Sequence, residues 1–391
     1  MAAAGERISD GDPVHLFCWT AEALSGWFES HGLPAYRARQ VMEWVYGHGA
    51  VSFEQMTNLP AELRAELSGE FAIYRSTVAA DPQAPDGTRK LLLRWPDGAT
   101  SECVLIPEPE RNTACLSSQV GCPVQCTFCA SGIGGLERQL TAGEIVEQAM
   151  RVRALCTAPA TGLHGAFPAG RAVSEPFASV AAPDPRTPKP KPRSLTNIVF
   201  MGIGEPLANY EAVIAAVRTI NAPWGMNIGA RRITISTVGL PRQIRRLADE
   251  GLQINLAISL HAASDDLRRR LIPWAERVSI SELVDAARYY FERTGREVTL
   301  EYVMLGGVNV RSADAQRLAR VTRQMRCNVN LIPYNPVAGR SYRRPDDGTV
   351  QEFVRALRER GVNAHVRRSR GLEIDAACGQ LREAHKTQAE R

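Results

Sequence analysis

The sequence of 391 residues lacks an apolar run long enough to cross a lipid bilayer. Its first residues, MAAAGERISDGDP, also lack the basic and then apolar pattern of a secretory signal peptide. Without such a signal, nine cysteines favour a reducing compartment, where thiols serve metal binding or catalysis rather than disulfide scaffolds. We therefore expect a cytoplasmic protein that does not associate with membranes.

A large excess of one charge is also lacking, because the formal net charge is only +5. The basic residues are nevertheless clustered, with arginines at 231–232, 268–270, 343–344 and in the RRSR segment 367–370. Such clusters can neutralise phosphates, which makes nucleic acid a candidate partner. A solvated helix face that carries arginines explains them equally well.

An internal repeat is absent too, apart from an alternation of strand-like and helical segments that starts near residue 113. The strand candidates are residues 114–120, 195–201, 231–237, 252–260, 297–305 and 327–333. Alternating β and α segments over this length predict an α/β fold with a parallel sheet, here a partial (β/α)6 TIM-like barrel. Ligands of such folds bind at the C-terminal ends of the strands.

The segments outside this alternation predict the domain organisation. We expect a disordered N-terminus at 1–19, a small helical accessory domain at 20–80, and a β-hairpin linker at 81–110 around the turn Pro96-Asp97-Gly98. The core then spans 111–368 and is interrupted by an insertion at 157–194, rich in Pro, Ala, Gly and Ser, that cannot bury a core. A tail at 369–391 carries Cys378.

Three cysteines within a short loop sequence carry the strongest chemical signal. Cys122, Cys126 and Cys129 have the spacing C-x3-C-x2-C, and thiolates at such spacings hold iron–sulfur clusters. Three local ligands leave one iron of a four-iron cluster open, and an open metal position is typical of catalytic sites. The alternatives are a zinc knuckle with a distant fourth ligand or plain core cysteines, although zinc sites more often show paired C-x2-C units.

The chain as a whole resembles a known enzyme family. The segments CLSSQVGCPVQCTFCASG, MGIGEPL, ITISTVG, ISLHA, LIPYNP and CGQL occur in order and resemble the RlmN-type radical S-adenosylmethionine (SAM) 23S rRNA adenine-C2 methyltransferases. The segments also resemble those of the related Cfr-type enzymes, which methylate C8 of adenine. The resemblance covers residues 20–155 and 195–382, which leaves out the insertion.

This resemblance implies two cofactors and their ligands. Cys122, Cys126 and Cys129 would bind one [4Fe-4S] cluster, and SAM would chelate the open iron. The family's SAM contacts fall on Gly204, Glu205, Ser236, Ser259, Leu260, His261 and Asn335. Without the resemblance, ordinary roles such as helix capping, a satisfied strand-end histidine or a turn would be preferred for Ser236, His261 and Asn335.

The resemblance also implies how the reaction proceeds. One SAM would methylate Cys378, and a radical made from a second SAM would remove a hydrogen from that methyl group. The carbon radical would add to the adenine, giving a covalent protein–RNA intermediate. Cys115 would resolve this intermediate by forming a disulfide with Cys378, which requires an accessible and partly ionised thiol. Glu102 would accept the C2 proton, with Cys115 as the rival base.

The implied partners are 23S rRNA, in some members also adenosine 37 of tRNAs, and a flavodoxin-type electron donor, and we expect a monomer. Three other functions stay open at this point. They are C8 methylation by the same cysteine pair, a radical SAM reaction on a substrate other than RNA, and a non-catalytic iron–sulfur or zinc protein that binds RNA.

Overall fold

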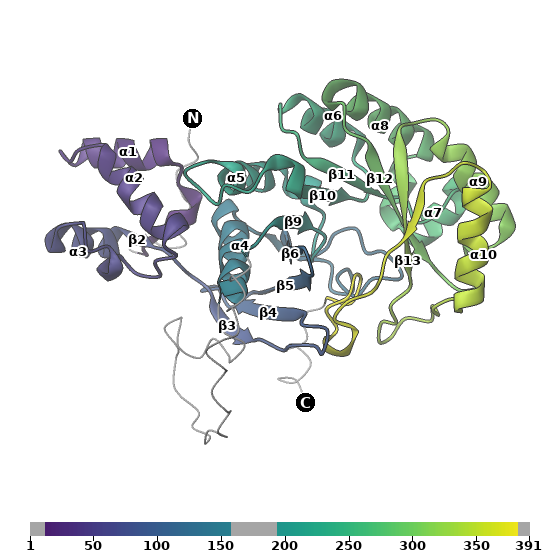
Figure 1. Cartoon of the computed structure of the whole chain (residues 1–391), viewed down its shortest axis with the longest axis horizontal. Coiled ribbons are helices and arrows are strands. Elements are labelled where there is room, and N and C mark those ends of the chain that lie inside the picture. The colour runs from purple at the N-terminus through teal and green to yellow at the C-terminus, as the bar shows by residue number, and fades with distance from the viewer. Residues whose placement is uncertain (1–11, 158–193, 382–391) are drawn as a thin grey trace, which may run out of the picture.

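The computed structural model describes residues 12–157 and 194–381, and its centre is a ten-stranded sheet (Figure 1). Seven consecutive strands of this sheet are parallel: β6 (Arg111–Cys115), β9 (Asn197–Phe200), β10 (Ile233–Thr237), β11 (Asn255–Ser259), β12 (Val298–Met304), β13 (Cys327–Pro333) and β14 (Ala364–Val366). Helices connect them: α4 (Ala142–Thr157), α5 (Tyr210–Asn221), α6 (Pro241–Asp249), α7 (Asp265–Leu271), α8 (Ile280–Thr294), α9 (Ser312–Thr322) and α10 (Asp347–Arg358). This confirms the predicted partial barrel.

Five of the six predicted strands lie where the sequence predicts them, but the first is only partly correct. The strand predicted at 114–120 ends at Cys115, because the chain leaves the sheet at Ser117. The Ser117 hydroxyl donates a hydrogen bond of 2.5 Å to the carbonyl of Glu102. Gln119–Gly121 then form β7, which pairs with β8 (Leu136–Gln139) in a separate small sheet that brackets the cysteine loop.

The predicted hairpin exists, but it is not a linker. Strands β4 (Arg89–Arg94) and β5 (Thr100–Glu108) are antiparallel, and β5 pairs directly with β6 of the barrel. Strand β3 (Thr77–Ala80) adds the outer edge, although its residues fall within the predicted helical domain. The hairpin therefore extends the barrel sheet, because the unpaired edge of β6 offers it backbone partners.

The N-terminal domain is mostly helical, as the sequence predicts. It contains α1 (Ala21–Ser30), α2 (Tyr36–Met42) and α3 (Ala61–Glu70), which pack around buried apolar side chains such as Phe28 and Leu67. The predicted disorder is wrong for residues 14–19, because β1 (Val14–His15) pairs with β2 (Phe71–Ala72) and Leu16–Cys18 form a buried turn. Residues 1–11 and 158–193 lie outside the described residues, so the predicted insertion is not described.

Helix α4 joins this domain to the barrel through a buried carboxylate. Glu147 is fully buried and accepts hydrogen bonds from the backbone of Arg75 at 2.8 Å and of Ser76 at 3.0 Å. Its carboxylate also pairs with Arg151 at 2.8 Å and lies 3.2 Å from His15. The Glu147 carboxylate thus connects the barrel with the N-terminal segment and with the chain before β3.

None of the helices in the described part of the chain combines the length and hydropathy that a membrane span requires.

Candidate active site

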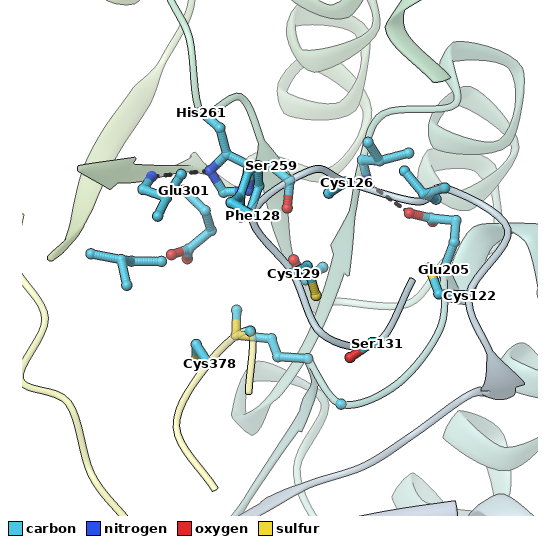
Figure 2. A pocket seen from close by; sticks show the side chains of 18 of the residues that line it. Cys122, Cys126, Phe128, Cys129, Ser131, Glu205, Ser259, His261, Glu301 and Cys378 are labelled. Carbon is cyan, nitrogen blue, oxygen red and sulfur yellow. Dashed lines mark hydrogen bonds between the residues drawn. The ribbon is translucent and has the colours of Figure 1, made fainter. Parts of the chain in front are cut away.

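A cavity of about 170 Å³ lies at the C-terminal ends of the barrel strands (Figure 2). It brings together most of the residues predicted from the sequence: Cys122, Cys126, Cys129, Gly204, Glu205, Ser236, Ser259, His261, Asn335 and Cys378. Leu260 is buried but does not line the cavity, and its backbone N–H bonds to the carbonyl of Glu301 at 3.0 Å. Cys115 and Glu102 lie outside it as well.

The loop that carries the three cysteines is held by contacts with distant segments. The backbone N–H of Thr127 donates to the carbonyl of Leu271 at 2.9 Å, and its hydroxyl bonds to Tyr342 at 2.7 Å. Phe128 packs edge-on against His261 with ring centroids 5.0 Å apart. Gly132 must lack a side chain, since a Cβ there would lie 2.7 Å from the Cα of Gln125. These contacts fix the loop across the mouth of the barrel.

The cysteine loop fits an iron–sulfur cluster. Its three thiols line one cavity, and burial raises the pKa of Cys126 well above its ordinary value, so a thiolate there needs positively charged partners such as irons. The C-x3-C-x2-C spacing of these cysteines is typical of a cluster, in which each cysteine binds a different iron.

The turn after β9 brings Glu205 to the cavity because its glycines allow a close approach. A Cβ on Gly204, whose φ is +108°, would lie 2.7 Å from the side chain of Gln119. The two Glu205 oxygens accept hydrogen bonds from the N–H groups of Leu207 at 2.9 Å and Val238 at 2.6 Å. Burial raises the pKa of Glu205 to about 7, and these backbone donors oppose the rise.

His261 follows β11 in the left-handed backbone region, with φ of +56°. Its Nδ1 accepts a hydrogen bond of 3.1 Å from the backbone N–H of Val303, so the ring proton resides on Nε2. Burial lowers the pKa of the imidazole to about 3, which keeps it neutral at physiological pH. His261 therefore offers the cavity an N–H donor and not a charge.

Asn335 is engaged by the tail that carries Cys378. Its Nδ2 donates to the carbonyl of Cys378 at 3.1 Å, and its Oδ1 accepts from the Ser369 hydroxyl at 2.6 Å. The cysteine loop holds the tail from the other side, because the N–H of Ala130 bonds to Gly379 at 2.8 Å and Ser131 bonds to Leu381 at 2.9 Å. The tail is therefore part of the cavity wall.

Cys115 lies with Cys378 on a second, larger cavity of about 1000 Å³ inside the barrel. Its side chain is only 6% exposed. Burial raises its pKa to about 12, and the neighbouring Cys378 sulfur contributes to the rise. The sequence prediction of an accessible, partly ionised thiol does not describe this conformation, in which Cys115 is protonated at neutral pH.

Glu102 lies beneath the tail on β5 and lines neither of the two cavities. It is 2% exposed, and its Oε1 pairs with Lys90 Nζ at 3.1 Å. Lys90 also donates to the carbonyl of Asp375 in the tail at 3.3 Å. The carboxylate predicted to accept a proton is therefore paired with a lysine that also contacts the segment carrying Cys378.

The sequence interpretation missed several residues of the cavities, chiefly Glu301 and Arg367. Glu301 could have been noticed as a carboxylate inside the otherwise apolar strand sequence VTLEYVM. Another arginine of the basic clusters, Arg268, is 1% exposed and bonds to the carbonyl of Val238 at 2.5 Å. It supports the strand ends from within and does not offer a charge to RNA.

Comparisons with known proteins identify the family. Residues 14–73 match the ribosomal RNA large subunit methyltransferase N-terminal domain, and residues 189–319 match the radical SAM superfamily. The chain is 42% identical to a probable dual-specificity RNA methyltransferase RlmN of Rhodopirellula baltica, over 94% of this chain and 90% of that protein. It is 44% identical to the corresponding protein of Gloeobacter violaceus, with 93% of each covered.

A solved structure agrees with these sequence relatives. The crystal structure of a radical SAM methyltransferase from Sphaerobacter thermophilus superposes with a TM-score of 0.85 and 44% identity, covering 95% of this chain and 99% of that one. Radical SAM enzymes use a [4Fe-4S] cluster and SAM, and the cysteine loop described above fits that cluster. The chain belongs to the RlmN family of radical SAM methyltransferases.

Proposed function

We propose that this protein methylates C2 of an adenine in 23S rRNA, and adenosine 37 of certain tRNAs, through a methyl group carried on Cys378. The relatives named dual-specificity RNA methyltransferases and the match to a ribosomal RNA methyltransferase domain support an RNA substrate. The observation that carries the proposal is the position of Cys378. It lines both the cavity of the three cluster cysteines and the cavity that contains Cys115.

The proposed roles divide between the two cavities. Cys122, Cys126 and Cys129 would hold the cluster, which supplies the electron that splits SAM. Gly204, Glu205, Ser236, Ser259, Leu260, His261 and Asn335 are the proposed SAM contacts. Leu260 would act through its backbone, because its side chain is buried, and His261 through its Nε2 proton.

Transfer to the base assigns three further roles. Cys378 would carry the methyl group to the adenine, Glu102 would accept the C2 proton, and Cys115 would attack the Cys378 sulfur to release the product. Because Cys115 is buried and its pKa is raised to about 12, we expect it to ionise only after the tail moves. The same movement would release Lys90, which now bonds both to the carbonyl of Asp375 and to Glu102.

The proposal extends to the protein's surroundings. We infer that it acts as a monomer in the cytoplasm, that a flavodoxin-type donor reduces the cluster, and that the helical N-terminal domain contacts RNA. The match of residues 14–73 to a domain of ribosomal RNA methyltransferases supports the last of these inferences.

The test is mass spectrometry of adenosine from RNA incubated with the reconstituted enzyme, SAM and reductant, comparing the wild type with Cys378→Ala. We expect 2-methyladenosine from the wild type only. The appearance of 8-methyladenosine would contradict the proposed position of methylation. If SAM is cleaved but neither enzyme yields methylated adenosine, the proposed substrate is wrong.

A further inference from the structure

Glu301 is a buried carboxylate in the middle of β12 that has one oxygen without a hydrogen-bond partner. The residue is 3% exposed, and its Oε1 accepts a hydrogen bond of 3.0 Å from Asn330 on the neighbouring strand. Among the described residues, Oε2 has no partner. A buried acceptor without a partner destabilises the protein, because it has lost its hydrogen bonds to water. The site is therefore incomplete until a hydrogen-bond donor arrives.

The unpartnered oxygen faces the space in which the chemistry is proposed to occur. Glu301 lines both cavities, as do Arg367 and Cys378. In Figure 2 its side chain extends away from His261 toward the side of the cavity on which Cys378 lies. A donor that satisfies Glu301 would therefore belong to a molecule bound next to Cys378.

Arg367 lines the same two cavities as Glu301 and Cys378. Its guanidinium interacts electrostatically with both residues, and one of its nitrogens lies 3.3 Å from the Met201 sulfur. The cavity wall thus offers the reactive sulfur of Cys378, a donor on Arg367 and an acceptor on Glu301.

The edge of an adenine carries the groups that would match these three. C2 is the reacting carbon, N1 beside it is an acceptor, and the N6 amino group beyond it is a donor. Enzymes that act on an extruded base read it through hydrogen bonds to such an edge. We propose that Glu301 is the specificity-determining residue that accepts a hydrogen bond from the N6 amino group of the target adenine, a role that rests on the proposed function.

Guanine does not fit this arrangement. It presents a carbonyl oxygen in place of the N6 amino group, so two acceptors would face each other at Glu301, and its protonated N1 would face the Arg367 donor. Sites that hydrogen-bond a substrate group discriminate strongly against analogues that lack it, because the buried partner is then left unpaired. The C8 edge of adenine offers the same order of groups, so this pair of residues selects adenine and not the carbon that reacts.

The test combines one protein change with one change of substrate atoms. In Glu301→Gln, Oε1 can still accept from Asn330, and the amide then presents a donor to the cavity where Oε2 had been an acceptor. An RNA hairpin is prepared with either adenosine or purine riboside at the target position, and purine riboside lacks only the amino group. Methyl transfer is measured as kcat/KM for the four combinations. Glu292→Gln, on the exposed side of α8, is the matched control.

Each change alone is expected to lower kcat/KM by about 10- to 100-fold, which corresponds to one lost hydrogen bond in a site that reads a base. The two changes combined should lower kcat/KM little more than either change alone, because both remove the same contact. Any intrinsic difference in the reactivity of purine cancels in this comparison. Cluster content and the circular dichroism spectrum should equal the wild-type values, which shows that Glu301→Gln folds.

Several results would overturn the inference while leaving the proposed function intact. Losses that multiply would show that Glu301 acts on something other than the amino group. Wild-type enzyme that methylates both hairpins equally well would do the same. A raised KM for SAM in the RNA-free cleavage assay would assign Glu301 to SAM. If the wild type methylates neither hairpin, by contrast, the proposed function itself fails.

Discussion

Replacing Glu147 with glutamine is expected to loosen the junction between the N-terminal domain and the barrel. The carboxylate is fully buried and holds the N–H groups of Arg75 and Ser76, the charge of Arg151 and the ring of His15, which lies 3.2 Å away. Burial alone would raise the pKa of Glu147, but the bond to His15 and the charge of Arg151 outweigh burial and lower it to about 2. The carboxylate is therefore more stable in the folded protein than in the unfolded chain.

The size of this effect follows from the pKa difference. A fall of the pKa from its ordinary value of 4.5 to about 2 corresponds to about 3 kcal/mol, at about 1.4 kcal/mol for each pKa unit. Because the folded pKa is depressed, this stability is fully present above the unfolded pKa and is lost as the pH falls through the folded value. Glu147→Gln should therefore lower the free energy of unfolding by about 3 kcal/mol throughout pH 5–8.

Urea unfolding of the wild type and the variant, followed by circular dichroism under anaerobic conditions, measures this difference. Glu211→Gln serves as the control, because Glu211 also pairs with an arginine but its side chain is 78% exposed. We expect a much smaller effect from it, since solvent screens exposed pairs. A loss below about 1 kcal/mol for Glu147→Gln, or a difference that fades between pH 8 and pH 6, would refute the reasoning.

Three further predictions concern the site. Lys90→Met removes the cation beside Glu102 and should lower the formation of methyladenosine at least about tenfold. Lys90→Arg keeps a cation there and should restore most of the activity. Equal activity of the two variants would contradict this role of Lys90. Asn335→Ala removes the hydrogen bond to the Cys378 carbonyl, which is worth about 1 kcal/mol. The rate at which iodoacetamide alkylates Cys378, measured by peptide mass spectrometry, should therefore rise several-fold. An unchanged rate would show that other contacts hold the tail. Gly204→Ala places a Cβ 2.7 Å from the Gln119 side chain, at a φ of +108°. The variant should therefore bind SAM more weakly in equilibrium dialysis. Wild-type affinity would show that the turn can adjust.

Much of the barrel could be predicted because its signals are local. Each parallel strand is a short apolar run followed by a helical segment, and the structure confirms five of the six runs. The first failed at Ser117, because the predicted run extends to Val120 but a hydroxyl bond to Glu102 turns the chain out of the sheet. A contact between two segments on different strands leaves no trace in the local pattern.

The site was predictable for a different reason and to a different depth. The cysteine spacing and the glycine turn are contiguous motifs, so the cavity residues could be assembled from the sequence. The burial of Glu102 and Cys115 could not, because it depends on how the tail packs. Ala376 and Leu381 of the tail form a small apolar cluster with Cys115 and Val104, and no sequence pattern announces that pairing.

The packing of the tail also explains how one cysteine could serve two reactions. Figure 1 shows the tail beside β4 and β5, where Lys90 and Asp86 bind its backbone. In that position Cys378 lines both the cavity of the cluster cysteines and the cavity inside the barrel. Under the proposed function, SAM would approach the sulfur from the first cavity and the adenine from the second. The two substrates then need not compete for one space, and a small movement of the tail would suffice to bring Cys378 from one to the other.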